Sequence, residues 1–398
     1  MARSRTRTAD VAPDVAGPRL VVLVVVLGLT LLGFVMIFSA SSISAITEEA
    51  DQTSYLVDQL VFAVIGIAAA FVLWKVLPYE LWATPVIWGV WGVAILLLLL
   101  TAVSGIAALG AQRWLVLGPI SLQPSEFAKI AIVLMAAYQF SNFRAGMVDA
   151  RQFGILILLC VVLPTAFLYK SQSDLGTTAI IAVGILAVMW YGEAPLRIVL
   201  IVIAALVLFA VFAVVFSGYR GDRFLYLNPW DDGEGGKGKG YQLVHSYYAI
   251  AEGGIFGVGL GNSREKYLYL PESETDFIYS IICEELGLVG AIIVIAAFLV
   301  LLWAGTRIAR AASTDFGSMM AGSIIVMLVF QAFLNIGCAI GVFPTTGKPL
   351  PFISSGGSSL IASFMMIGLV LSVSEGSSSN EIANRRRDEL KVVRVKRP

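Results

Sequence analysis

The chain has 398 residues, of which 58% are hydrophobic and 14% charged, and its mean hydropathy is +0.86. Soluble domains are about 45–50% apolar and about 25% charged. This composition therefore excludes an ordinary soluble protein, a disordered chain, a disulfide scaffold and a nucleic-acid-binding protein with a basic face. The 27 lysines and arginines equal the 27 aspartates and glutamates in number, so the positions of the charges are more informative than their sum.

Apolar stretches recur along the whole chain. A bilayer core about 30 Å thick requires about 20 apolar residues per helix, and lipid-exposed backbone must satisfy its own hydrogen bonds, so we expect helices. The predicted fold class is an all-α integral membrane protein with about ten transmembrane helices. The predicted spans are residues 20–38, 56–74, 82–102, 126–140, 153–169, 175–191, 197–217, 277–304, 317–343 and 355–374.

The first span follows Arg3, Arg5 and Arg7, as a secretory signal would. It is longer than the apolar core of about 7–15 residues that a signal peptide has, so we expect an uncleaved transmembrane helix. Most lysines and arginines fall on one side of the spans when both tails are placed in the cytoplasm, which is the side that basic loops favour. The sequence predicts a cytoplasmic N-terminal tail (1–18), one membrane domain (19–374) and a basic cytoplasmic C-terminal tail (375–398).

A long extracytoplasmic segment, residues 218–276, separates the seventh and eighth predicted spans. Its tyrosines, tryptophan, arginines and carboxylates favour a structured cap, because binding groups are often found on loops. A passive surface loop is the alternative. Cys160, Cys283 and Cys338 lie in apolar runs without a CxxC pair, so we interpret them as core thiols. With a single histidine, His245, we predict no metal site built from protein ligands.

Ionisable groups in or beside a span are costly, so each is a candidate functional residue. Asp276 opens the eighth predicted span, where a carboxylate acts as a helix cap or, if partly buried, as a general base with a raised pKa. Glu284, further into the same helix, returns near the face of Asp276, whereas Glu285 is rotated away. We predict that Glu284 and Glu285 are buried hydrogen-bond partners that support packing.

Glu126 and Lys129 begin the fourth predicted span, and their i,i+3 spacing allows them to pair on one face. They form either a structural clasp or the polar floor of an outward cavity. Further charged residues share this outer side, and cations beside carboxylates suit an anionic, phosphate-bearing substrate that arrives from the bilayer. The predicted substrate-binding or cavity residues are Arg113, Glu126, Lys129, Asp174, Arg220, Arg223, Arg264, Lys266 and Lys348.

Nine short motifs follow one another along the chain. They are Gly110–Leu115, Gln123–Lys129, Gln172–Gly176, Asn228–Trp230, Gly240–Gln242, Gly259–Ser263, Leu270–Phe277, Glu284–Gly287 and Pro344–Ser359. In this order, together with ten spans, they resemble the SEDS family (shape, elongation, division and sporulation), which is the FtsW/RodA/SpoVE group. The resemblance covers nearly the whole chain and is closest to the division-type members.

This resemblance implies a peptidoglycan glycosyltransferase of the bacterial inner membrane that polymerises lipid II, an undecaprenyl-pyrophosphoryl disaccharide-pentapeptide. It also implies a class B penicillin-binding protein as a crosslinking partner, together with other division or elongation proteins. The family's essential carboxylate corresponds to Asp276, its Glu–Lys pair in the central cavity to Glu126 and Lys129, and a further motif aspartate to Asp174. The chain departs from the family pattern at four positions that leave the expected base in place: Ser173, His245, Lys348 and Ser355.

The expected reaction is a single displacement in which Asp276 deprotonates a sugar hydroxyl. The outer cations, or a divalent cation such as Mg or Mn, would neutralise the leaving pyrophosphate. A lipid II flippase or another transporter of lipid-linked precursors is the alternative, and a carrier is expected to show a polar path from both faces. A scaffold for division proteins, without chemistry of its own, is a third interpretation.

Overall fold

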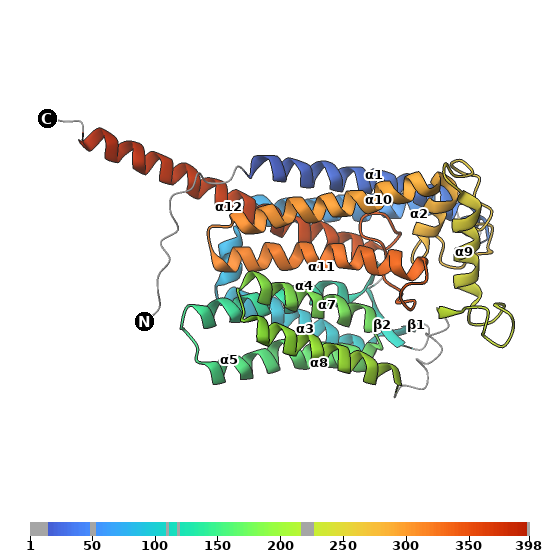
Figure 1. The fold of residues 1–398 in the computed structure, drawn as a ribbon, viewed down its shortest axis with the longest axis horizontal. Coiled ribbons are helices and arrows are strands. Elements are labelled where there is room, and N and C mark those ends of the chain that lie inside the picture. The colour runs from blue at the N-terminus through green and yellow to red at the C-terminus, as the bar shows by residue number, and fades with distance from the viewer. Residues whose placement is uncertain (1–14, 48–52, 109–110, 118–119, 216–226, 396–398) are drawn as a thin grey trace.

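The computed structural model is a bundle of long helices with a small sheet and a short helix at one end (Figure 1). It describes residues 15–47, 53–108, 111–117, 120–215 and 227–395. The elements before the middle of the chain are α1 (Ala16–Thr47), α2 (Ser54–Phe71), η1 (Val72–Val76), η2 (Tyr79–Ala83), α3 (Val86–Ser104), α4 (Pro124–Arg144), α5 (Ala150–Ile157), η3 (Leu158–Val162), α6 (Leu163–Gln172) and α7 (Leu175–Tyr191). The later ones are α8 (Leu196–Val215), α9 (Tyr241–Gly253), α10 (Ile278–Ala311), α11 (Asp315–Ala339) and α12 (Gly357–Val395).

The predicted apolar stretches lie on helices over most of their described length, which confirms the mainly helical membrane fold. By length and composition, seven described segments can cross a bilayer: Ala16–Ser41, Ser54–Val76, Val86–Val103, Ala150–Gln172, Ile278–Ala311, Asp315–Ala339 and Gly357–Gly376. Two other apolar helices, α7 and the Leu196–Phe209 part of α8, are shorter than these, and α4 has Glu126 and Lys129 near its start. The number of ten spans therefore stays a prediction.

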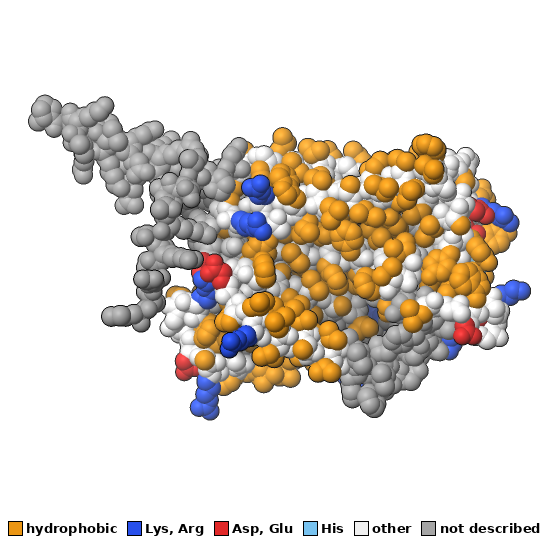
Figure 2. Space-filling view, viewed as in Figure 1, with side chains coloured by type: hydrophobic (Ala, Val, Ile, Leu, Met, Phe, Trp, Pro, Cys, Tyr) orange, Lys and Arg blue, Asp and Glu red, His pale blue; other side chains and the backbone are white. Residues whose placement is uncertain are grey.

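The lateral surface of the bundle is apolar. Figure 2 shows hydrophobic side chains over the side of the molecule, with charged side chains gathered toward its two ends. Large hydrophobic residues are exposed on α1, α2, α3, α8 and α10. An exposed apolar surface of this extent is rare in soluble monomers, whereas it suits the hydrocarbon core of a membrane. The chain is therefore a multi-pass membrane protein.

One element at the end of the bundle differs from the all-α prediction. Between α3 and α4 the strands β1 (Ile106–Ala108), β2 (Ala111–Leu117) and β3 (Ile120–Leu122) form an antiparallel sheet in the order β1-β2-β3. Strands of three to seven residues contain too few alternating positions to give a periodic signal in sequence. The end that bears this sheet and α9 is called the sheet end below, and the opposite end, where α1 begins and α12 leaves the bundle, is the tail end (Figure 1).

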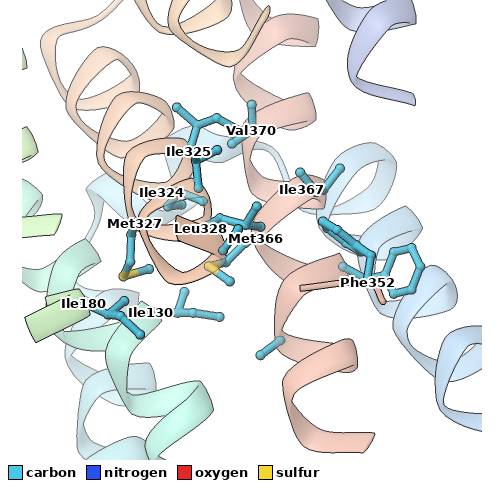
Figure 3. Packing of buried hydrophobic residues seen from close by; sticks show 14 of the residues in the cluster. Ile130, Ile180, Ile324, Ile325, Met327, Leu328, Phe352, Met366, Ile367 and Val370 are labelled. Carbon is cyan, nitrogen blue, oxygen red and sulfur yellow. The ribbon is translucent and has the colours of Figure 1, made fainter. Parts of the chain in front are cut away.

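The core is centred on α11, which packs against α4, α7, α10 and α12. Figure 3 shows its apolar side chains between Ile130 of α4, Ile180 of α7 and Met366 of α12. At the tail end, Arg144 of α4 donates to the Gly192 carbonyl at 2.6 Å and pairs with Asp315 of α11 at 3.4 Å. Because most of α11 is buried, the polar residues on it are surrounded by packed side chains.

Two helices differ from the spans predicted for them, one in its length and one by an internal break. The helix α12 is longer than the predicted span 355–374, since it continues without a break to Val395 and projects from the tail end (Figure 1). The Glu, Ala, Arg, Leu and Lys residues after position 380 favour helix enough to extend it past the serine-rich stretch. In addition, α10 is broken at Gly287, which has φ 67° and ψ −166°.

Candidate active site

Four buried charged residues meet at the sheet end, where the start of α4 and the α6–α7 link approach the segment 340–356. Lys348 Nζ lies 2.7 Å from Asp174 Oδ2 and 3.7 Å from Glu126 Oε1. Lys129 Nζ lies 2.6 Å from Glu126 Oε2. Each of the four residues is at most 3% exposed. This set, called the buried charge cluster, is neutral overall and gives every charge a partner, as burial requires.

Local sequence explains how the cluster forms. Pro124 occupies the first turn of α4, where a missing N–H costs nothing. Asp174 is the N-cap of α7, and its carboxylate accepts hydrogen bonds from the Thr177 N–H at 2.9 Å and hydroxyl at 2.8 Å. Gly176 allows the side chain of Lys348 to lie against α7, since a Cβ there would come within 2.7 Å of Lys348 Cγ.

The cluster holds fixed charge. Burial alone would raise the pKa of Asp174, but the Lys348 ammonium and the Thr177 N–H hold that pKa below its usual range. Burial would lower the pKa of Lys348, but Asp174 and Glu126 together raise it above its usual range. Because both groups stay ionised through neutral pH, this pair supplies a permanent electric field and does not exchange protons during a reaction.

Asp276 lies beside the cluster and is fixed through its backbone. Asn335 Nδ2 of α11 donates to the Asp276 carbonyl and to the Lys348 carbonyl, both at 2.8 Å. The half-buried Asp276 carboxylate has no hydrogen-bond or ion-pair partner among the residues that the structure describes. Gly347 lies next to this carboxylate, since a Cβ at that glycine would be 3.5 Å from Asp276 Oδ2.

The environment of Asp276 favours proton transfer. Burial, and then the neighbouring Glu272 carboxylate, raise the pKa of Asp276 to about 6, while Lys348 and Arg113 act in the opposite direction. A general base is most effective when its pKa is near the working pH. A carboxylate that no described residue pairs with, and whose pKa is about 6, can therefore accept a proton near neutral pH.

Arg113 joins the sheet to this site. From β2, its Nε donates to the Gln172 carbonyl at 2.9 Å and its guanidinium to the Ser173 carbonyl at 3.2 Å. Ser173 has the left-handed φ of 49°, which turns the chain sharply between α6 and α7. The half-buried guanidinium keeps some of its donors unused by these two bonds, so it is a fixed cation that can meet an anion.

A second set of charges lies apart from the first and fastens the cap to α10. Glu284 accepts from the Ser263 hydroxyl at 2.6 Å. Glu285 accepts from the Ser39 hydroxyl at 2.6 Å and pairs with Lys266 Nζ at 3.2 Å. Lys266 also donates to the Gly261 carbonyl at 2.7 Å and is buried. These contacts join α1, α10 and the segment 261–266.

Loss of Lys266 is expected to destabilise the protein. Lys266→Met would leave Glu285 buried without its cation, and breaking a buried pair costs about 3–5 kcal/mol. The double variant Lys266→Met/Glu285→Gln removes both charges and should recover most of that loss. Thermal unfolding of the purified protein in one detergent measures this difference. Equal losses in the single and double variants would contradict a stabilising role for the pair.

The predicted site residues thus divide into three groups. Six lie at one place: Asp276, Arg113, Glu126, Lys129, Asp174 and Lys348. Four lie elsewhere in the cap and α10, where the exposed Arg264 pairs with Glu252 at 3.8 Å: Arg264, Lys266, Glu284 and Glu285. Arg220 and Arg223 lie outside the described residues.

Two polar residues of α11 were missed by the sequence analysis. Gln331 accepts a hydrogen bond from Lys129 Nζ at 2.6 Å and donates to the Pro349 carbonyl at 3.0 Å. Asn335, one turn later, donates hydrogen bonds to the Asp276 and Lys348 carbonyls. An amide in the middle of an apolar span is itself a signal, because polar groups are costly there. That signal could have identified both residues.

A cation site built from protein ligands is absent from the described residues. They contain no group of three His, Cys, Asp or Glu side chains close enough to hold a metal ion. Glu126 and Asp174 are bound by lysines. The donors around Asp276 therefore do not fit a divalent cation held by protein ligands alone.

An apolar cavity of about 300 Å³ lies between η1, α3, α4 and α12. Phe127, Ile130 and Leu134 line it from α4, the helix that also holds Glu126 and Lys129. Leu97 of α3 and Leu369 of α12 form further parts of its wall. A cavity with this lining suits a hydrocarbon chain.

The fold and the site define a multi-pass membrane protein with a polar centre at one end of its helices. The family model for FtsW/RodA/SpoVE, described as a cell cycle protein, matches residues 19–379. The chain belongs to this family. It is 40% identical over 369 residues to the probable peptidoglycan glycosyltransferase FtsW of Geobacter metallireducens, covering 89% of this chain and 94% of that protein. It is 37% identical over 370 residues to stage V sporulation protein E of Bacillus subtilis, with 90% and 98% covered.

Solved structures agree with this assignment. One, described as "Structural coordination of polymerization and crosslinking by a peptidoglycan synthase complex", is 28% identical, with a TM-score of 0.71 and 89% of this chain and 97% of that chain covered. The rod shape determining protein RodA of Thermus thermophilus is also 28% identical, with a TM-score of 0.64 and 89% and 95% covered. The helical arrangement is therefore that of known members of the family.

Proposed function

We propose that this protein is a peptidoglycan glycosyltransferase that polymerises lipid II, with Asp276 as its general base. The observation that supports this most strongly is the half-buried Asp276 carboxylate, which no described residue pairs with, beside a cluster of fixed charges. The similarity to relatives named probable peptidoglycan glycosyltransferase supports the reaction class.

In the proposed reaction, Asp276 takes the proton of the sugar 4-hydroxyl of an incoming lipid II while that oxygen attacks the anomeric carbon of the growing chain. The bond from that carbon to undecaprenyl pyrophosphate breaks, and the leaving group takes the electron pair. One displacement inverts the carbon and gives a β-1,4 linkage. Pyrophosphate leaves without protonation when cations neutralise it, so no second catalytic carboxylate is required, in contrast to glycoside hydrolases.

The cations have different parts in this proposal. Arg113 is half-buried and retains donors, so it is our candidate for contact with the pyrophosphate. Lys129 and Lys348 are paired with carboxylates and would act through their field, without touching the substrate. Arg264 is exposed, and its only ion pair in the described chain, with Glu252, is long at 3.8 Å. It is therefore a second candidate for anion contact, further along the cap.

The surroundings suit a lipid-linked substrate. The apolar cavity beside α4 matches a prenyl chain, and two such lipids held in one membrane plane gain proximity. We propose that both tails are cytoplasmic and that Asp276 is extracytoplasmic, since Arg144, Arg197, Arg307 and Arg310 lie toward the tail end. We further propose a class B penicillin-binding protein as the partner that crosslinks the new strand.

The test is glycan polymerisation from lipid II by the purified protein together with its penicillin-binding partner, whose own transpeptidase is blocked. Polymer is expected from the complex and none from the partner alone. If no polymer forms while the protein moves lipid II between leaflets of a vesicle, the flippase interpretation replaces this one.

A further inference from the structure

The segment Gly253–Gly261 has an unusual composition for an outer loop. Its nine residues are five glycines and Ile255, Phe256, Val258 and Leu260, without any polar or charged side chain. All four apolar side chains point away from the protein, with exposed fractions of 61%, 82%, 40% and 55%. Charged residues stand on both sides of it, Glu252 before and Arg264 after. Exposing every apolar side chain of a loop to water is unfavourable, and such a patch usually marks a contact with lipid or protein.

This segment is fastened to α10 at the Gly287 break. Helices that break leave backbone groups unsatisfied, and here the loop provides the missing partners. The fit is close, since a Cβ at Gly257 would clash with the Glu285 carbonyl oxygen. Four hydrogen bonds join the two segments: Val258 N–H to Glu284 O at 2.9 Å, Gly259 N–H to Glu285 O at 3.1 Å, Leu288 N–H to Gly254 O at 2.9 Å, and Val289 N–H to Ile255 O at 3.2 Å.

The exposure pattern of α10 locates the edge of the lipid at the same break. Residues 278–285 are buried on every side, whereas exposed apolar residues recur from Leu288 onward. The 34 residues of α10 are more than the roughly 20 that cross a hydrocarbon core about 30 Å thick. From Leu288 to Arg307 the helix covers about 30 Å. Exposed apolar residues begin at Leu288, so a lipid boundary at Leu288, with the first two turns of α10 outside the hydrocarbon, fits this pattern.

We propose that Gly253–Gly261 is a membrane-inserting loop, with Ile255, Phe256, Val258 and Leu260 among the lipid chains of the leaflet at the sheet end. The loop is bonded to Leu288 and Val289, so its side chains continue the lipid-facing stripe that Ile292 and Ile293 prolong. Backbone that is not helical enters a membrane only when its polar groups are satisfied, and the four bonds to α10 meet this requirement. Charged Glu252 and Arg264 remain at the headgroup level.

Insertion would anchor the cap to the bilayer. The loop lies between α9 and the segment 261–266, whose Ser263 and Lys266 bind Glu284 and Glu285. The cap is therefore fastened both to α10 and to lipid, which fixes its height above the membrane. This inference depends on the membrane fold and holds whether or not Asp276 is a catalytic base.

The test is the depth of a nitroxide spin label at Phe256→Cys in lipid vesicles without other proteins. The natural cysteines, Cys160, Cys283 and Cys338, are buried, so the unmutated protein serves as the labelling control. Ile292→Cys on the lipid-facing stripe and Asp231→Cys in the polar part of the cap are the reference positions. We expect the Phe256 label to be relaxed more by oxygen than by a water-soluble nickel chelate, as at Ile292.

The result that overturns the proposal is a Phe256 label as accessible to the nickel chelate as the one at Asp231. If that accessible label becomes protected only when the penicillin-binding partner is added, the loop is a protein interface and not a lipid anchor. Leu260→Cys is measured in parallel and is expected to give the same ratio as Phe256→Cys. Both side chains are exposed, so neither change should disturb folding.

Discussion

Asp276→Asn is expected to lower the rate of glycan polymerisation by about 100- to 10,000-fold, the range that a positioned general base contributes. Asparagine keeps the shape of the side chain and cannot take the proton of the sugar hydroxyl. The Asn335 bond to the Asp276 backbone carbonyl does not involve the side chain and should remain. The amount of polymer formed from labelled lipid II over time, with the penicillin-binding partner present, gives the rate.

The same variant should be more stable than the natural protein at neutral pH. The pKa of Asp276 is raised to about 6 from an ordinary value of 3.8, so this residue favours the folded state below about pH 4, and that contribution is lost as the pH rises through 6. Each pKa difference of one is worth about 1.4 kcal/mol, and we expect a gain of about 1–3 kcal/mol for the half-buried site at pH 7.5. At pH 4 the gain should vanish.

Glu272→Gln is the matched control. It removes a negative charge from the same segment, and this charge raises the pKa of Asp276. The variant should polymerise lipid II as fast as the natural protein at alkaline pH. It should also stay active to lower pH, because the pKa of Asp276 falls when the Glu272 charge is removed. A folded Asp276→Asn that polymerises at the natural rate would refute the assignment of the base.

Hydropathy predicted the helices well, and the reason is physical. A bilayer imposes a long apolar segment on each span, which leaves a signal in sequence that depends on no distant contact. Charges beside such segments were informative for the same reason, since Asp276 and Glu126 are costly there. The sheet, in contrast, consists of strands too short to leave a periodic pattern.

Partners distant in sequence could not be predicted. Lys266 and Lys348 occur in similar outer loops, and nothing in their local sequence separates them. In the fold, Lys266 is buried against Glu285 beneath the cap, whereas Lys348 lies between Asp174 and Glu126 beside Asp276. The difference depends on how segments that are far apart along the chain meet. The break of α10 at Gly287 could not be predicted either, since a glycine in a long apolar helix is compatible with an unbroken span.

Lys348→Met is expected both to destabilise the protein and to change its pH profile. Lys348 is shared by two buried carboxylates, and without it Asp174 loses its cation, at a cost of about 3–5 kcal/mol. Because the Lys348 ammonium lowers the pKa of Asp276, its loss should raise that pKa and move the acidic limb of the polymerisation profile to higher pH. Unfolding in detergent and rate against pH measure the two effects separately.

The double variant Lys348→Met/Asp174→Asn separates structure from electrostatics. It removes one buried charge of each sign near Glu126, so most of the stability should return. The field of Lys348 at Asp276 is still absent, so the acidic limb should stay at the higher pH expected for the single variant. If the double variant is stable and its profile matches the natural one, the cluster supports the fold without tuning Asp276. If the single variant keeps its stability, Glu126 and Asp174 do not need Lys348, and the pairing observed at 2.7 Å contributes little to folding.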